Sequence, residues 1–137
     1  MDNSVNALNS IDVLIVVDVV GALASGNLSN NVYLVDTNKY MGSWNQGHCE
    51  LGTVCHDTQR INWRVVPISP STNVSIIRFT GEIISKQVCV PTKQGEIDDE
   101  YWTARMQSRG VKTTYQYACV LSMNGKEMTF DPYIKVI

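Results

Sequence analysis

The longest apolar stretch of the chain, Ile11–Val20, is rich in β-branched residues and carries apolar side chains on both faces of an extended strand. β-Branched side chains lose χ1 freedom in a helix and fit the pleated surface of a sheet. The stretch is too short to cross a bilayer and contains two carboxylates, Asp12 and Asp18. We therefore predict a central strand buried on both faces, with the aspartates near its ends, where solvent or a backbone donor reaches them. A short buried helix is the alternative.

The residues after this stretch are polar and rich in turn-forming types. Gly21–Asn31 shows no helical period, and we predict a loop whose length suits a crossing between two sheets. Asn31–Asp36 is a second short strand. Thr37–Cys55 is expected to be a polar, glycine-rich excursion dominated by turns.

Four further segments have the alternation and the β-branched and aromatic content of strands. They are Ile61–Ile68, Val74–Phe79, Ile83–Val90 and Tyr101–Met106. In the second of these, Ile76 is expected on one face and Ile77 and Phe79 on the other, and Gly81 begins a turn. The polar, acidic stretch Thr92–Glu100 is expected to be a loop.

The C-terminal segment contains the strongest local signal, a β-hairpin. Asn124-Gly125 is typical of a type I′ turn, in which both central residues take a positive φ. The two-residue loop is expected to pair Met123 with Lys126, Ser122 with Glu127, Leu121 with Met128, Val120 with Thr129 and Cys119 with Phe130. The pairs at Leu121 and Cys119 form an apolar face, and the alternate pairs form a more polar one. Pro132, opposite Tyr117, ends or bulges the ladder.

These segments amount to seven or eight short strands with irregular connections and almost no helix. Such a pattern predicts an all-β, single-domain antiparallel β-sandwich, jelly-roll or Greek-key-like. Residues 1–10 are polar and are expected to form a loose N-terminal segment, and residues 11–137 form the one β-sandwich domain.

Composition narrows the functional classes. The chain has 137 residues, 44% of them hydrophobic, which is enough for one well-formed core. Its 11 basic and 13 acidic residues give a net charge of −2 without a basic cluster, which disfavours nucleic acid and anionic membranes as partners. The N-terminus lacks the basic region of a signal peptide, so we expect a cytoplasmic protein whose four cysteines are reduced.

Two histidines and two cysteines form a mirrored pair in the polar excursion: His48, Cys49, Cys55 and His56. Zinc prefers such ligands, but neighbouring residues rarely reach one ion together, and the spacing does not match a zinc knuckle. The same adjacency argues against Cys55 as a nucleophile activated by His56. The chain also lacks the sequence motifs of nucleotide-binding folds, serine hydrolases and zinc proteases, so we predict no enzymatic activity.

Two oxygen-rich loops contain aromatic residues and are candidates for binding calcium or a sugar. The candidate residues are Asp36, Asn38, Tyr40 and Trp44 in the first loop and Asp98, Asp99, Glu100 and Trp102 in the second. Calcium takes roughly six to eight oxygen ligands, for which Asp36, Asp98 and Asp99 are the candidates. Aromatic rings beside carboxylates and amides also suit a sugar, and the loops of a sandwich gather at its ends. The alternative interpretation is a solvated acidic turn with anchoring aromatics.

Six stretches, taken in order, carry a family resemblance: Ile11–Asp18, Gly26–Thr37, Gly42–Asn45, Ile61–Val65, Asp99–Trp102 and Phe130–Tyr133. Together they resemble the AidA/PixA family of bacterial inclusion body proteins over nearly the whole domain. The resemblance implies a small, often abundant cytoplasmic protein of proteobacteria, made late in growth or under quorum-sensing control, which in some members collects in crystalline inclusions. It implies no catalytic residues. The inclusion-forming type is methionine-rich, whereas this chain has five methionines, so a methionine-storage role does not follow.

These observations favour a non-enzymatic, self-associating inclusion body protein, a homodimer or a higher assembly. Edge strands of a sandwich offer unpaired backbone groups to a second copy, and the small net charge does little to oppose contact. The alternative is a carbohydrate-binding module, a lectin that uses loops 36–44 and 98–102 with or without calcium. An enzyme of unassigned class is the third hypothesis.

Overall fold

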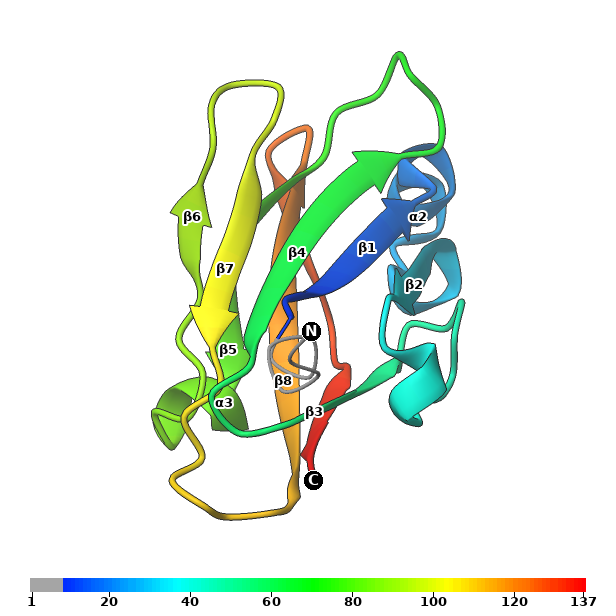
Figure 1. Cartoon of the computed structure of the whole chain (residues 1–137). Coiled ribbons are helices and arrows are strands. Elements are labelled where there is room, and N and C mark those ends of the chain that lie inside the picture. The colour runs from blue at the N-terminus through cyan, green and yellow to red at the C-terminus, as the bar shows by residue number, and fades with distance from the viewer. Residues whose placement is uncertain (1–8) are drawn as a thin grey trace.

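The computed structural model describes residues 9–137, which form two packed β-sheets (Figure 1). Most of the predicted loose N-terminal segment, residues 1–8, lies outside the described residues. Strand accounts for 47% of the structure and helix for 13%, so the predicted β-sandwich with little helix is confirmed. No helix among the described residues has both the length and the apolar character needed to span a bilayer.

Sheet A consists of β1 (Ile11–Val17), β2 (Val32–Asp36), β4 (Arg60–Pro67), β6 (Thr92–Gln94) and β7 (Tyr101–Arg105). Its strand order is β2-β1-β4-β7-β6. The neighbours β1 and β4 run parallel, and the other pairs run antiparallel. This sheet is therefore mixed rather than purely antiparallel.

Sheet B consists of β3 (Gly52–Cys55), β5 (Ser75–Gly81), β8 (Thr114–Met123), β9 (Lys126–Phe130) and β10 (Tyr133–Val136). Its order is β3-β10-β8-β5. β8 pairs with β10 through residues 114–116 and with β9 through residues 119–123. Here too one pair, β3 with β10, is parallel. Purely local hairpins do not produce parallel pairs, so long connections must return the chain to each sheet.

The C-terminal hairpin forms in the predicted register, with all five β8–β9 pairs as expected. Asn124 and Gly125 both have positive φ, at 51° and 78°. The backbone N–H of Tyr117 donates to the carbonyl of Pro132 at 3.0 Å, so the proline marks the junction between β9 and β10. Val120, on the more polar face, is nevertheless buried at 5% exposure. It lies between Thr129 and Arg78, and the Arg78–Glu127 ion pair covers that face.

β1 is the predicted central strand, but only one of its faces is fully buried. Ile11, Ile15 and the other odd-numbered residues are at most 2% exposed and face sheet B. Leu14 and Val16 point the other way and are half-exposed, because no second layer among the described residues packs on that face. Asp12 is exposed, as expected for an aspartate near the strand end.

The first strand ends earlier than predicted, and the expected loop after it is largely helical. Helix α2 (Val19–Ser25) begins at Asp18, whose carboxylate accepts the backbone N–H of Gly21 at 3.0 Å. It ends at Gly26, which has a φ of 69°, a conformation that glycine tolerates best. The prediction was wrong because the two β-branched residues that open the helix resemble a continuing strand. The capping aspartate and glycine were the opposing signal. A short 3₁₀ turn, η1 (Ser29–Asn31), then leads into β2.

The predicted strand Ile83–Val90 is also wrong. Gly81 turns the chain with a φ of 93°, and a short helix, α3 (Glu82–Ser85), follows. The buried residues after it include the adjacent Val88 and Cys89, which a strand would place on opposite faces. The residues after the helix are therefore buried although they do not form a strand, because the chain follows an irregular path against the end of sheet B.

Three further strands, β5, β3 and β6, also differ from the predictions. β5 contains a bulge between Ile76 and Arg78, so Ile76 and Phe79 both face the core instead of opposite faces. β3 lies within the predicted polar excursion, which also contains the 3₁₀ turn η2 (Lys39–Met41). β6 lies within the predicted acidic loop. These last two strands are short, and each pairs with only one neighbouring strand of its sheet.

Aromatic side chains join the two sheets at the centre of the core. Trp63 of β4 is fully buried, and its indole N–H donates to the hydroxyl of Tyr117 in β8 at 3.0 Å. The Phe79 ring lies 4.9 Å from that of Trp63 and 5.5 Å from that of Trp102. The hydrogen bond satisfies two polar groups that would otherwise be buried without partners.

The connection from β7 to β8 is held by one carboxylate. Asp57 accepts the backbone N–H groups of Ser108 at 2.8 Å and Gly110 at 2.9 Å, and that of its neighbour Thr58 at 3.1 Å. The N–H of Gly110 is the largest cause that holds the pKa of Asp57 below its ordinary value of 3.8. A carboxylate with a lowered folded-state pKa stabilises the fold above the unfolded-state pKa, and this contribution is lost as the pH falls through the folded value.

We expect Asp57→Ala to lower the free energy of unfolding by about 1–2 kcal/mol at pH 7, because three backbone donors lose their acceptor. The difference from the native protein should shrink as the pH falls below about 4, because the carboxylate is then protonated first in the unfolded state and, at lower pH, in the folded state. Urea unfolding of both proteins at pH 7 and pH 3 measures this. Asp131→Ala is the matched control, because Asp131 is exposed and accepts no hydrogen bond within the described residues. An equal loss at both pH values would contradict the assignment.

Candidate functional site

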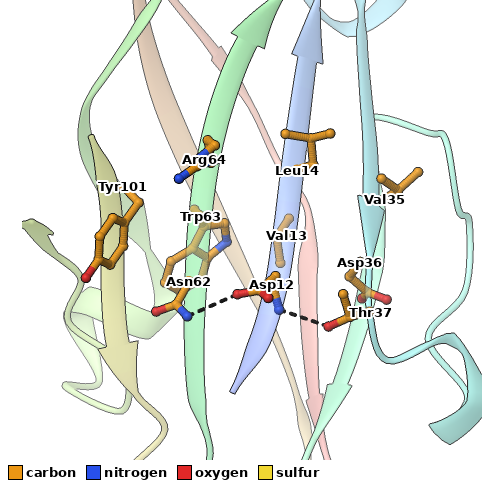
Figure 2. Close-up of a pocket in the computed structure, with 10 residues that line it drawn as sticks. All are labelled: Asp12, Val13, Leu14, Val35, Asp36, Thr37, Asn62, Trp63, Arg64 and Tyr101. Atoms are coloured by element: carbon orange, nitrogen blue, oxygen red, sulfur yellow. Dashed lines mark hydrogen bonds between the residues drawn. The ribbon is translucent and has the colours of Figure 1, made fainter. Parts of the chain in front are cut away.

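The outer face of sheet A, turned away from sheet B, is hollowed into a groove of about 440 Å³. Its walls come from four neighbouring strands, β2, β1, β4 and β7, as Figure 2 shows. The register of the sheet places the side chains in rows that run across the strands. Two of these rows form the groove.

The first row is polar and is hydrogen-bonded from strand to strand. The Asn62 amide donates to Asp12 Oδ1 at 3.1 Å and accepts from the Thr103 hydroxyl at 2.7 Å. The Asp12 backbone N–H donates to the Thr37 hydroxyl at 3.0 Å, and Arg60 donates to Thr103 at 3.1 Å. We call Thr37, Asp12, Asn62 and Thr103 the polar row. These bonds hold its side chains in one orientation, and Figure 2 shows the two that Asp12 makes, with Asn62 and with Thr37.

The second row provides apolar surface and one aromatic ring. Val35 and Leu14 are directly paired across β2 and β1, and Arg64 of β4 is paired with Leu14 on the other side. Tyr101, the first residue of β7, closes the row at the far end of the groove (Figure 2). The groove therefore combines a hydrogen-bonding wall with an apolar one.

Few of the charges around the groove are free. The guanidinium of Arg64 forms an ion pair with Asp99 at 2.7 Å. Both carboxylate oxygens of Asp36 accept hydrogen bonds, from Gln46 at 2.9 Å and from Thr53 at 2.8 Å. Asp12 Oδ2 receives no hydrogen bond within the described part of the chain. It is the open carboxylate oxygen of the groove.

The first predicted loop is built mainly as a structural anchor. Asn38 is buried, and its amide donates to the carbonyl of Val54. The Trp44 ring lies so close to Gly52 that a side chain there would collide with it. Tyr40 is 78% exposed and stands apart from the groove lining. Of the four candidates in this loop, only Asp36 reaches the groove.

The second predicted loop lines a different hollow, which we call the end hollow. It has a volume of about 630 Å³ and lies among three connections: residues 95–100, residues 67–75 and the β8–β9 turn. All four candidates of this loop line it: Asp98, Asp99, Glu100 and Trp102. Glu100 forms an ion pair with Lys93 at 3.1 Å, and the ring of Trp102 packs on Phe79.

The two predicted loops do not converge, since one follows β2 and the other precedes β7, with two strands between. Within residues 9–137, no group of three or more histidine, cysteine or acidic side chains is placed to hold a metal ion. Within that range, neither the calcium candidates nor the mirrored histidine–cysteine pair forms such a group. Calcium dependence stays a prediction.

Burial disfavours the ionised form of two cysteine thiols. Desolvation, with a smaller contribution from the Asp57 carboxylate, raises the pKa of the Cys55 thiol to about 12. Desolvation likewise raises the pKa of the Cys89 thiol to about 12. Neither thiol is ionised near neutral pH, and a thiol must ionise to act as a nucleophile.

Most residues of the groove were not among the sequence-based candidates. Asp12, Asn62 and Tyr101 occupy alternating outward positions on three strands that are far apart in the sequence. The polar positions 62 and 64 in an otherwise apolar strand did signal an exposed face on β4. The pairing of β1 with β4, which aligns Asp12 with Asn62, had no local signal.

Residues 9–129 match a protein family described as a domain of unknown function (DUF8788). The chain belongs to this family. Among curated proteins, none matches the chain. The DUF8788 domain is similar in fold to the inclusion body protein PixA from Burkholderia cenocepacia J2315. The TM-score with that crystal structure is 0.69 at 13% sequence identity, and the match covers 93% of this chain and 92% of that chain. The resemblance to the AidA/PixA family is therefore supported at the level of the fold.

Proposed function

We propose that this protein is a non-enzymatic, cytoplasmic, self-associating protein of the inclusion body type, which assembles through the outer face of sheet A. The observation that carries the proposal is a set of half-exposed apolar side chains on three neighbouring strands. We call this set the apolar patch: Leu14, Val16, Tyr33, Val35 and Val66. Tyr33 and Val35 are each 42% exposed.

The apolar patch is continuous across the strands. Val16 of β1 pairs with Tyr33 on one side and Val66 on the other, and Leu14 pairs with Val35 one row further. Contiguous exposed apolar surface on a monomer marks a contact site more often than scattered residues do. A second copy of the same face would remove this surface from water.

The sheet edges are less suited to association than the edge-strand hypothesis requires. Segment 44–47 covers two of them, because Trp44 and Gly52 exchange two backbone hydrogen bonds at 2.9 Å and Gly47 donates to Leu34 of β2. β5 is bulged, and β6 has only three residues, including Lys93. Bulges, short strands and lysines all oppose edge-to-edge pairing. These features favour contact through the face of sheet A.

The size of the face suggests weak, concentration-dependent contacts. Four strands of about seven residues span an area of about 450 Å², roughly half of the 800 Å² that each partner of a standard interface buries. Weak contacts of this kind suit a protein that assembles only when abundant. The fold of PixA, described as an inclusion body protein, supports the same class of role, and a net charge of −2 opposes contact little.

A charge-matched pair of double variants tests self-association. Tyr33→Lys/Val35→Lys places two lysines on the apolar patch, whereas Tyr40→Lys/Val90→Lys places them at residues 78% and 54% exposed elsewhere. We expect the weight-average mass by light scattering to rise above 15.3 kDa with concentration for the native and control proteins. The patch variant should stay at that mass, with association weakened at least tenfold. A native protein that remains monomeric at high concentration, or identical behaviour of both variants, would reject the proposal.

The second candidate function is carbohydrate binding, as a lectin. The observation that favours it is the groove, in which a fixed polar row faces an apolar row, together with the end hollow lined by loop 98–102. A broad glycan array, read with calcium and with a chelator, tests this function and its calcium dependence. No signal in either condition would reject it.

A further inference from the structure

We propose that the groove on sheet A, rather than the predicted loops, binds an uncharged oligosaccharide that lies across β2, β1, β4 and β7. The inference rests on the second proposed function and assigns a site and a ligand class to it. Of the sequence-based candidates, Asp36 alone lines this groove.

The two walls match the two kinds of surface on a pyranose ring. A sugar presents hydroxyl groups at its edges and C–H groups on its faces, so it needs polar and apolar contacts side by side. The polar row offers a carboxylate, an amide and a hydroxyl, from Asp12, Asn62 and Thr37. Leu14 and the Tyr101 ring lie one row away (Figure 2). Pockets with few, well-placed polar groups among apolar ones are typical ligand sites.

The polar row is oriented before any ligand arrives and still has unused hydrogen-bonding capacity. Asn62 is held between Asp12 and Thr103, and one of its amide hydrogens is engaged, while the other has no acceptor among residues 9–137. Asp12 Oδ2 accepts nothing within the described residues. Side chains that are already ordered lose little entropy on binding, which favours affinity from a small number of contacts.

The charges favour a neutral ligand over an anionic one. Arg64, the cation in the groove, is already paired with Asp99 at 2.7 Å. The open carboxylate of Asp12 would repel a phosphate, sulfate or uronic acid held against the same row. A neutral sugar donates its hydroxyl protons to that carboxylate, and charge-assisted hydrogen bonds of this kind are the stronger ones.

The shape favours a chain of sugars over a single one. The groove crosses four strands, and three spacings between neighbouring strands extend about 14 Å. The two tryptophan rings of the predicted loops are less available for stacking on a sugar, because Trp44 packs on Gly52 and Trp102 packs on Phe79. Tyr101 is the aromatic residue that lines the groove at its surface.

Glycan arrays and calorimetry test the inference. The probes are neutral trisaccharides (maltotriose, cellotriose and chitotriose) and acidic trigalacturonic acid, with a broad array to extend the neutral set. We expect the native protein to bind neutral chains, and Tyr101→Ser and Asp12→Ala to weaken that binding at least tenfold. Asp12→Asn keeps an acceptor for Asn62 but removes the charge, so it should gain binding to the acidic probe. Impaired folding would not produce such a gain.

Asp98→Asn in the end hollow is the matched control, since it makes the same chemical change at another exposed aspartate. Thermal unfolding confirms that each variant is folded. Binding that survives in the Tyr101 and Asp12 variants but is lost in the control would overturn the groove assignment while leaving the lectin function intact. A preference of the native protein for acidic glycans would overturn the ligand class. No binding to any glycan would overturn both the inference and the lectin function.

Discussion

Replacing Trp63 with alanine is expected to lower the free energy of unfolding by about 4 kcal/mol, since a fully buried tryptophan leaves a large cavity. A loss of this size corresponds to a fall in Tm of more than about 10 °C for a domain of this length. Urea and thermal unfolding measure both quantities. Trp102→Ala, at a half-buried tryptophan, is the control and should cost clearly less. A loss below about 1 kcal/mol at Trp63 would contradict its role as the central contact between the sheets.

The hydrogen bond between Trp63 and Tyr117 can be separated from the packing by a double-mutant cycle. Trp63→Phe leaves the Tyr117 hydroxyl buried without its donor, and Tyr117→Phe leaves the indole N–H without its acceptor. Each single variant should cost about 1–3 kcal/mol for the unsatisfied group, in addition to any lost volume. The double variant should cost less than the sum of the two, because both polar groups are then gone. Additive losses would show that the bond carries no coupling energy.

Replacing Gly52 with alanine is expected to lower the free energy of unfolding by about 2 kcal/mol from overpacking. The added methyl group would meet the indole ring of Trp44, and the backbone of Gly52 is bonded to that of Trp44 through two hydrogen bonds. Displacing Trp44 would also uncover the edges of β2 and β3, so we expect faster aggregation on mild heating. Unfolding in urea measures the first effect, and light scattering with an amyloid dye measures the second.

The Trp44→Ala background provides the control for this prediction. Without the indole ring, Gly52→Ala has nothing to displace and should cost much less than it does in the native protein. If the cost is the same in both backgrounds, the close approach of Trp44 is not the reason that position 52 requires glycine. If aggregation is unchanged, segment 44–47 does not protect the sheet edges.

The two proposed functions depend on overlapping sets of residues. Self-association depends on the apolar patch, and sugar binding depends on the polar row and Tyr101, although both use the outer face of sheet A. Val35 and Leu14 belong to the patch and also line the groove. A bound oligosaccharide should therefore weaken self-association, which light scattering with and without the sugar measures. Independent behaviour would place the two contacts on different surfaces.

The sequence alone determined the β-sandwich class and the C-terminal hairpin to the residue. The hairpin could be read because its signal is local: Asn124-Gly125 specifies the turn, and alternating side chains then fix every pair of β8 and β9. The outward polar residues of β4 were also readable, since alternation within one strand reports exposure. Helix α2 was missed because its opening valines favour a strand, and packing of its buried face outweighed that weak preference.

Tertiary structure alone decided the candidate site. The parallel pairing of β1 with β4 sets Asp12 beside Asn62, residues 50 positions apart, and no local pattern specifies which strands become neighbours. It also separated the two loops that the sequence suggested would meet, because β2 and β7 stand on opposite sides of β1 and β4. Side-chain periodicity says which face of a strand is polar. Only the order and register of strands say which polar residues share a surface, and those depend on how the whole core packs.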